Sequence, residues 1–383
     1  MASKDKRRPA ASNKKRTLCV FCGKEPIDKN REHILPKWLM ALTGDLHRPV
    51  WLGQDFRTGK GRVFSYSSLT APSCTKCNEK YANLEGRVKP VMLSVLAEAP
   101  ISRDEFNVLL DWFDKVRIGM WLLYYHLDGN MAGVDPLFHI DQRLGTQDRM
   151  LIISKASDVV PDLTYRGVNS PSFYYTPSCF SLMVNQYLFT NISYPLLFSK
   201  SLGMPWSVKS ALNVEGMLLH SISPGTEVIA TPILAERSLL PCTILYQPMW
   251  AGFVGSSVEQ LYNTHYCREG ALDPSSGVGA IFLENGDGIA ALSSEPTIDW
   301  VPPVGPNTDA SRYLQSKTTL KLQNYIDSLL PNLSALSEEQ REHYKEVQLT
   351  NRAHNDKTMD ELTRRWLQHI LDPTSTPVKK ITI

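Results

Sequence analysis

The sequence lacks any apolar segment long enough to cross a membrane, which requires about 20 mostly apolar residues in a helix. The longest uncharged run, Gly167 to Ser199, is interrupted by prolines and contains many Ser, Thr, Asn and Tyr residues. The run from Leu239 to Val258 contains Pro241 and Pro248. The basic N-terminus has no apolar stretch behind it, unlike a secretory signal. We therefore expect a cytoplasmic protein with no membrane partner.

The sequence also lacks the dense, even set of cysteines that builds a disulfide framework. Of its 7 cysteines, four form two Cys-x-x-Cys pairs. The pairs are Cys19/Cys22 and Cys74/Cys77, and the scattered cysteines are Cys179, Cys242 and Cys267. Paired spacing in an odd total favours a structural zinc site, in which four thiolates bind Zn²⁺ at about 2.3 Å. The alternative is four reduced cysteines in a core.

The small formal net charge of +2 hides an uneven distribution of charge along the chain. Residues 1–89 contain 19 basic and 8 acidic residues, a balance of +11. Subtraction from the totals of 41 and 39 leaves 22 basic and 31 acidic residues in 90–383, a balance of −9. We expect the basic end to contact a polyanion, because phosphate neutralisation drives such binding.

The length favours two or three domains. We expect a disordered basic arm over 1–16, a metal-binding domain over 17–100, a mixed α/β accessory or regulatory domain over 101–305, and a helical C-terminal segment over 306–383. The arm is expected to lie along phosphates or to serve only as a solubilising tail.

Three helical regions are predicted, over 76–97, from residue 102 onward and over 308–371. Capping boxes at Ser102–Glu105 and Ser337–Gln340 mark two helix starts. Apolar runs predict strands at 149–154, 179–190, 226–234 and 242–246. Asn285-Gly-Asp-Gly288 is typical of a hairpin turn. The apolar stripe Met359, Leu362, Trp366 and Ile370 is expected to face a core. No topology follows from these patterns.

The chemistry is concentrated between the cysteine pairs. Glu32 precedes His33, and a proline follows at position 36. An acid beside a histidine is a combination suited to hydrolysis. Asn78 directly follows Cys77, and its amide oxygen suits a hard cation. The alternative is that Asn78 caps the following helix.

The order Cys-x-x-Cys, Glu-His-x-x-Pro, Cys-x-x-Cys-Asn resembles the zinc-knuckle type of the HNH (ββα-metal) endonuclease superfamily over about residues 19–88. The resemblance implies an α+β chain in which a small zinc-stapled ββα domain precedes the larger α/β domain with its helical C-terminus. It implies that His33 is the general base. It also implies that Glu32 and Asn78 ligate a catalytic Mg²⁺ or Mn²⁺, while the four cysteines hold a structural Zn²⁺.

The sequence departs from the family pattern in two places. The position of the family's middle Asn is occupied by Leu69, and the neighbouring Ser68 or Thr70 is expected to substitute for it. The loop from Trp38 to Ser65 is long. Its basic residues and the one after Pro36 are candidate phosphate contacts, namely Lys37, Arg48, Arg57, Lys60 and Arg62. Glu85 lies two helical turns, about 10 Å, beyond Asn78, so we expect it to support or pack the site.

The resemblance implies a hydrolase that binds double-stranded DNA and nicks one strand per event. Similar domains occur in bacterial anti-phage systems, so we expect foreign or phage DNA as substrate, a role in antiviral defence, and protein partners from such a system. We also expect the acidic region to restrain or target the nuclease. Three alternatives stay open: a zinc-knuckle protein that binds nucleic acid without cleavage, an RNA-directed HNH nuclease, and an enzyme centred in residues 130–305.

Overall fold

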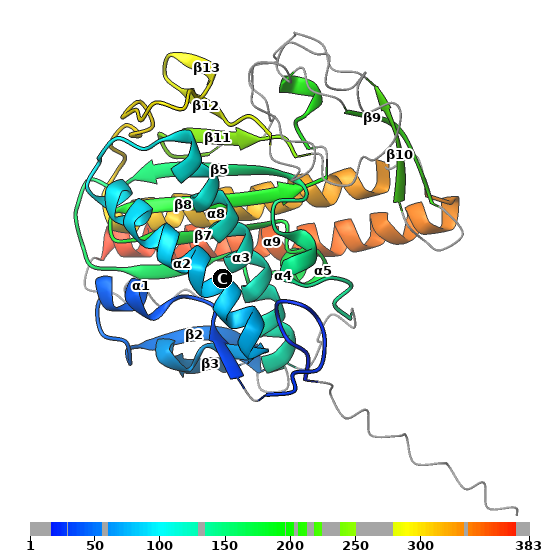
Figure 1. Cartoon of the computed structure of the whole chain (residues 1–383), viewed down its shortest axis with the longest axis horizontal. Helices are drawn as coiled ribbons and strands as arrows, with labels where there is room; N and C mark the ends of the chain where they lie inside the picture. The colour runs from blue at the N-terminus through cyan, green and yellow to red at the C-terminus, as the bar shows by residue number, and fades with distance from the viewer. Residues whose placement is uncertain are drawn as a thin grey trace, which may run out of the picture.

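A computed structural model describes the structure of most of the chain. The described residues are 17–28, 30–55, 60–128, 135–195, 197–202, 206–212, 218–223, 238–249, 279–332 and 336–372. They form a mixed α+β fold with a long C-terminal helix (Figure 1). The predicted basic arm 1–16 and the predicted strand 226–234 lie outside the described residues.

Two antiparallel strand pairs and two helices make up the N-terminal region, and its first strand pair with the second helix is termed the ββα unit. The elements of this region are β1 (Asn30–His33), α1 (Lys37–Leu42), β2 (Pro49–Asp55), β3 (Lys60–Ser65), the 3-10 turn η1 (Tyr66–Ser68), β4 (Thr70–Ser73) and α2 (Thr75–Leu96). β1 pairs antiparallel with β4, and β2 pairs antiparallel with β3. β4 leads through Cys74, the N-cap residue, into α2. The helix predicted over 76–97 is confirmed with both ends shifted by one residue.

The larger region contains an antiparallel sheet of seven strands in the order β13-β12-β11-β5-β8-β7-β6. The strands are β5 (Asp148–Lys155), β6 (Leu163–Arg166), β7 (Cys179–Val184), β8 (Tyr187–Tyr194), β11 (Thr243–Gln247), β12 (Phe282–Asn285) and β13 (Gly288–Ala291). The predicted turn at Asn285–Gly288 is confirmed. The single strand predicted over 179–190 was wrong. The chain turns at Asn185, whose φ is 53°, a left-handed conformation that Asn tolerates.

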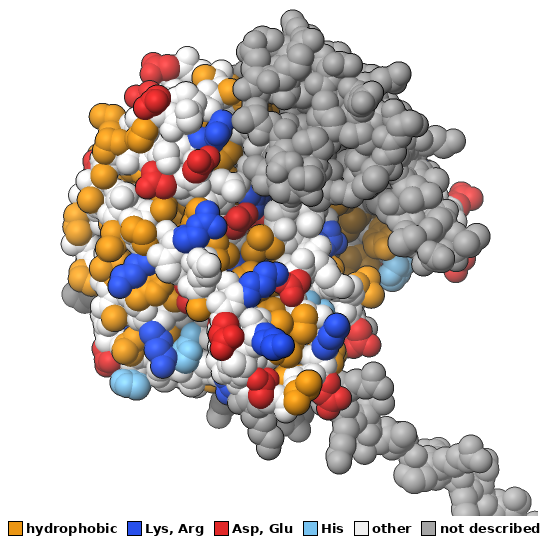
Figure 2. Space-filling model, in the orientation of Figure 1, with side chains coloured by type: hydrophobic (Ala, Val, Ile, Leu, Met, Phe, Trp, Pro, Cys, Tyr) orange, Lys and Arg blue, Asp and Glu red, His pale blue; other side chains and the backbone are white. Residues whose placement is uncertain are grey.

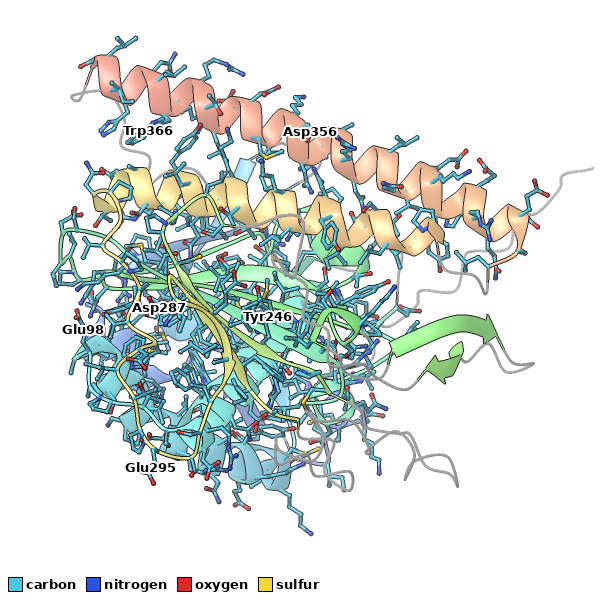
Figure 3. The ribbon with its side chains drawn as sticks, turned by 90° about the horizontal axis from the view of Figure 1, so that it is seen from above. Glu98, Tyr246, Asp287, Glu295, Asp356 and Trp366 are labelled. Carbon is cyan, nitrogen blue, oxygen red and sulfur yellow. The ribbon has the colours of Figure 1, made fainter. Side chains whose placement is uncertain are left out.

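Long helices cover both faces of this sheet (Figures 1 and 3). α3 (Arg103–Asp128) contacts β5 and β8 on the face toward α2, whereas α8 (Thr308–Leu329) contacts β6, β7 and β8. α9 (Glu338–Leu371) packs outside α8. Both predicted capping boxes are confirmed. Glu105 N donates to Ser102 Oγ, and Ser102 N donates to the Glu105 carboxylate. Ser337 and Gln340 exchange the equivalent bonds.

The hydrophobic core is continuous across residue 100, where the two main domains were predicted to meet. Buried residues of the cysteine region, α2, α3 and the sheet belong to one cluster. Trp112 and Phe113 of α3 are fully buried between the two regions. The predicted C-terminal stripe is confirmed at Leu362 and Trp366, which pack near Tyr313 of α8. The exception is Ile370, which is 55% exposed.

The remaining elements are short. They are α4 (Ile140–Arg143), α5 (Pro171–Tyr175), η2 (Lys200–Leu202), β9 (Trp206–Leu212), β10 (Leu218–Ser223) and η3 (Leu330–Asn332). β9 and β10 form a separate antiparallel pair. Among the helices of the described ranges, none combines the length and apolar character needed to cross a membrane.

Candidate functional site: a cysteine cluster and a histidine–acid centre

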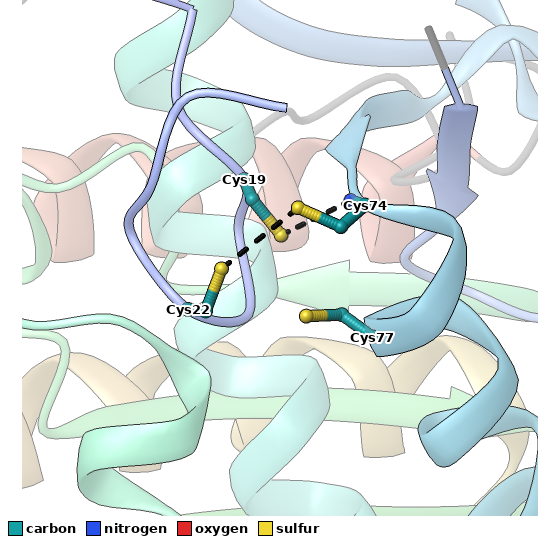
Figure 4. Close-up of side chains that lie close together, drawn as sticks. All are labelled: Cys19, Cys22, Cys74 and Cys77. Atoms are coloured by element: carbon teal, nitrogen blue, oxygen red, sulfur yellow. Dashed lines mark hydrogen bonds between the residues drawn. The ribbon is translucent and has the colours of Figure 1, made fainter. Parts of the chain in front are cut away.

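The four paired cysteines come together although more than fifty residues separate the pairs (Figure 4). Their Sγ atoms all lie within 4.8 Å of one another. The Sγ atoms of Cys22 and Cys74 are 3.9 Å apart. Four sulfurs at about 2.3 Å from a tetrahedral zinc ion are separated by about 3.8 Å. The cluster therefore has the donor type and the size that zinc requires.

Local backbone geometry builds both halves of the cluster. In the first, Gly23 N donates to Cys19 O at 2.9 Å. Gly23 has a φ of +70°, and a Cβ at this position would lie 2.5 Å from Nδ1 of His139. In the second, Asn78 N donates to Cys74 O at 2.9 Å as α2 begins. Glycine is thus required in the first half for conformation and for space.

Two of the four thiol groups resist deprotonation in the absence of a cation. Burial, with the thiols around it, raises the pKa of Cys74 to about 11, and the same causes raise the pKa of Cys77. Burial also opposes ionisation of Cys22, but hydrogen bonds outweigh it and lower the pKa of that thiol. A bound cation deprotonates coordinating thiols outright. The arrangement suits four sulfur ligands that exchange their protons for a metal ion.

His33 is the last residue of β1 and pairs with Thr70 of β4. Its Nε2 lies 3.2 Å from the carbonyl oxygen of Ser67. A carbonyl only accepts hydrogen bonds, so this contact requires a proton on Nε2 and leaves Nδ1 of the neutral ring with a lone pair. Burial lowers the pKa of His33, and the charge of Lys37 acts in the same direction. Neutral His33 is thus suited to accept a proton at neutral pH.

Glu32 lies on the opposite face of β1, as strand alternation requires. Its side chain is buried, and its Oε1 lies 2.5 Å from Nζ of Lys115 on α3. The same ammonium group pairs with Oε1 of Glu85 on α2. Burial disfavours the charged form of Lys115, but the two carboxylates outweigh it and raise the pKa of Lys115. Burial also raises the pKa of Glu85 despite the neighbouring ammonium.

Lys115 was missed by the sequence analysis. It occupies a fully buried position within the apolar stripe of α3, between Phe113 and Val116. A lysine at such a position is unusual, because buried lysines require a partner. This was the one available signal, and it does not identify the partners, which are 83 and 30 residues away.

Asn78 lies in the first turn of α2, beside β1. Its Nδ2 is 3.5 Å from the carbonyl oxygen of Arg31, which precedes Glu32. The alternative that Asn78 caps the helix was wrong, since Cys74 is the N-cap residue. The fold therefore places Asn78 beside Arg31, two residues before His33 on β1.

The residues near His33 fit a divalent cation in donor type and charge. Carboxylate and amide oxygens are the ligands that Mg²⁺ and Mn²⁺ prefer. Lys115 contacts Oε1 of Glu32 and Oε1 of Glu85, and neither Oε2 atom has a hydrogen bond to a described residue. One ammonium with two carboxylates leaves a charge of about −1. Within the described ranges, however, only the cysteines bring three His, Cys, Asp or Glu ligand atoms together. A cation here would therefore retain several water ligands, as Mg²⁺ commonly does.

The predicted phosphate-binding residues have different environments. Lys37 is exposed and acts electrostatically on His33. Arg48 is engaged internally: it donates to Met40 O, Asp45 O and Thr43 Oγ1 and lies over the Tyr66 ring. Arg62 Nη1 donates to Leu127 O. Lys60 lies in β3, and Arg57 lies outside the described residues. By placement, Lys37 is the best candidate.

Leu69 is buried, at 2% exposure. Neither of the side chains expected to replace the family's Asn is recorded in contact with His33. Ser68 Oγ donates to Ser65 O, and Thr70 Oγ1 accepts from Nε of Arg31. The backbone carbonyl of Ser67 holds the imidazole instead. A main-chain group of the turn before β4, rather than a side chain, therefore contacts His33.

Comparison of the chain with protein-family models, curated proteins and solved structures gave no match. A functional assignment consequently depends on the chemistry of the site. That chemistry comprises a cluster of four thiols, a neutral histidine held by one ring nitrogen, two carboxylates beside a buried lysine, and an exposed amide.

Proposed function

We propose that the chain is a zinc-stapled HNH-type endonuclease that hydrolyses phosphodiester bonds in DNA. The observation that carries the proposal is the placement of His33. It ends β1, its Nε2 is held by Ser67 O, and it lies in the charge field of Glu85, Lys115 and Lys37. A ββα unit with four clustered cysteines supports the same conclusion.

In the proposed reaction, Nδ1 of His33 takes a proton from a water molecule. The water oxygen attacks phosphorus, and the bond from phosphorus to the 3′ oxygen breaks. The 3′ oxygen takes up a proton from solvent water, which gives 5′-phosphate and 3′-hydroxyl ends. The Ser67 carbonyl keeps the imidazole oriented and fixes its tautomer. A divalent cation bound by Glu32 and Asn78 would stabilise negative charge on the phosphoryl and leaving oxygens. Lys37 contributes a positive charge beside the scissile phosphate.

The surface around α2 offers basic side chains for the nucleic-acid backbone. Lys76, Lys80, Arg87 and Lys89 are exposed on this helix. Figure 2 shows Lys and Arg side chains interspersed with acidic ones on the face that carries α2. A mixed surface favours moderate, salt-dependent affinity over tight non-specific binding. Cleavage of foreign or phage DNA is the biological role that we propose.

A supercoiled-plasmid assay with Mg²⁺ or Mn²⁺ tests the proposal. We expect conversion to open circles by the zinc-loaded protein and a loss of about 10²- to 10⁴-fold in His33→Ala, the range for removal of a general base. His343→Ala, an exposed histidine of α9, is the matched control. Because burial lowers the pKa of His33, the unprotonated base persists at acid pH. The rate should therefore reach half its maximum below the ordinary histidine value of about 6.5.

The competing functions predict other results in the same assay. A folded, zinc-loaded protein that shifts DNA in a gel but never cleaves it would be a binding module. Cleavage of RNA with intact DNA in parallel reactions would make the substrate RNA. Nicking that is unchanged in His33→Ala would overturn the assigned base.

A further inference from the structure

The histidine–acid centre contains a charged group from outside the ββα unit. Lys115, in the middle of α3, is fully buried and contacts Glu32 of β1 and Glu85 of α2. We propose that Lys115 is a positioning residue of the nuclease centre, which binds one oxygen of each carboxylate and so holds Glu32 and Glu85 together next to the strand that carries His33. This inference rests on the proposed nuclease function.

The geometry of α2 shows what Lys115 contributes. Two helical turns separate Glu85 from Asn78, about 10 Å along the axis, so the helix alone does not bring Glu85 to the site. Lys115 instead links Glu85 to Glu32, because one ammonium contacts both carboxylates. The charge of Glu85 then acts on His33. One side chain thus joins three elements that are separate in the sequence.

The energetics of buried ion pairs favour a functional role over a stabilising one. Taking an ammonium and two carboxylates out of water costs much of what their attraction returns, and apolar replacements of such groups are often neutral or stabilising. Neighbouring buried charges make ordinary structural pairs, such as Arg117 with Asp114 within α3. Lys115 instead reaches Glu32, the sequence neighbour of His33, and Glu85, whose charge acts on His33, and the group keeps a charge of about −1. That residual charge is what a cation and its bound phosphate require.

The consequence is that the nuclease centre is incomplete without α3. Residues 17–100 contain His33, Asn78 and both acids, but their arrangement depends on a residue beyond that boundary. At this contact the larger region assists the nuclease centre, and the expectation that the acidic region restrains or targets the nuclease stays a separate prediction.

The test uses full-length, zinc-loaded protein and three variants. Lys115→Met removes the charge with a side chain of similar length, Lys115→Arg keeps the charge, and Lys155→Met is the control. Lys155 pairs with Glu98 away from the site. Nicking is measured at saturating Mn²⁺, and Mn²⁺ binding without DNA is measured from the free-ion electron paramagnetic resonance signal. Zinc content and thermal unfolding report on folding.

We expect a 10- to 100-fold loss of nicking in Lys115→Met, the range for residues that orient metal ligands. Lys115→Arg should retain part of the nicking activity, and Lys155→Met should nick at the wild-type rate. The direction in which the Mn²⁺ affinity changes is a second test, independent of the nicking rate. Loss of a positive charge alone would tighten Mn²⁺ binding, whereas loss of ligand positioning weakens it, by about tenfold in our expectation.

The proposal is overturned if Lys115→Met nicks at the wild-type rate, if it binds Mn²⁺ more tightly, or if the Met and Arg variants are equally impaired. If Lys115→Met fails to retain zinc or to unfold cooperatively, Glu85→Gln decides. Glu85 keeps 21% of its side chain exposed, so this variant should fold. Tenfold weaker nicking supports the proposal, and wild-type nicking overturns it. Failure of the nuclease function is recognised separately, because wild type and His33→Ala would then be indistinguishable.

Discussion

The ββα unit and the seven-stranded sheet are held together in different ways. β1 and β4 have four residues each and pair only with one another, and isolated two-stranded pairs are marginal in water. In the sheet, by contrast, every residue of β7 and β8 is buried. We therefore expect the ββα unit to depend on a metal ion in the cysteine cluster, whereas the sheet relies on apolar burial.

Polar groups also serve different purposes in the two regions. Near His33, Lys115 and Glu32 are buried, Glu85 keeps 21% of its side chain exposed, and the three groups together leave a charge of about −1. In the sheet, the carboxylate of Asp148 is fully enclosed and accepts bonds from Phe198 N, Ser199 N, Ser199 Oγ and Met249 N. The candidate site thus includes a carboxylate that reaches solvent, at Glu85, whereas Asp148 of the sheet is fully buried.

Loss of the metal ion should give the largest difference in stability between the two regions. Structural zinc contributes about 10–16 kcal/mol to the folding of zinc-finger peptides, far more than one cysteine contributes by packing. In Cys77→Ser we expect loss of zinc and fast amide hydrogen exchange in β1, β4 and the start of α2, with β5, β7 and β8 still protected. Mass spectrometry of exchanged peptides measures this.

The matched control is Cys179→Ser, a buried thiol of β7. It should retain zinc and the protection of β1, with a modest loss of sheet stability. Simultaneous loss of protection in β1 and β8 on zinc removal would contradict the comparison. It would show that the continuous core makes both regions one cooperative unit.

The pH dependence of the free energy of unfolding tests the enclosed environment of Asp148 in the sheet. Burial raises the pKa of Asp148 to about 6, against an ordinary value of 3.8. The folded protein then binds this proton more readily than the unfolded chain. The resulting stability is fully present below pH 3.8 and is lost as the pH rises through about 6. The shift corresponds to about 3 kcal/mol, of which about 1 kcal/mol should appear between pH 7 and 5.

The measurement is the free energy of unfolding in urea for wild type and Asp148→Asn at several pH values. As the pH falls, the difference should move in favour of wild type. Asp287→Asn, at an exposed hairpin position, should show no such trend. A constant difference for Asp148→Asn would mean that the buried carboxyl group titrates normally.

The sequence predicts the parts of this structure that depend on local rules. Cysteine spacing located the cluster, because chelation requires paired ligands close in the chain. Ser102 and Ser337 marked true helix starts, because capping is a contact between residues three positions apart. The Glu32–His33 pair lies at a strand end, but its activity remains a prediction.

The missed features depend on contacts between distant segments. The ion pair of Lys115 with Glu32 forms only when α3 packs against β1, because the two residues are 83 positions apart in the sequence. β7 and β8 appeared as one strand because a sheet covered on both faces has no alternation of apolar and polar residues. The turn at Asn185 and Gln186 contains no glycine that would have marked it. The order of the sheet follows from tertiary packing that no single segment encodes.

Two glycine substitutions compare a loop of each region. Gly23 has a φ of +70° and abuts His139, whereas a Cβ on Gly286 would meet no atom within 4 Å. Gly23→Ala combines backbone strain of about 1–2 kcal/mol with a displaced imidazole, so we expect a loss of about 2 kcal/mol or more and weaker zinc retention. Gly286→Ala should change stability by at most about 1 kcal/mol, because its backbone does not require a positive φ. Thermal unfolding with zinc analysis distinguishes the variants. Equal effects would mean that the cysteine loop adapts its backbone as freely as the exposed hairpin, and that the metal ion, rather than Gly23, sets the shape of the loop.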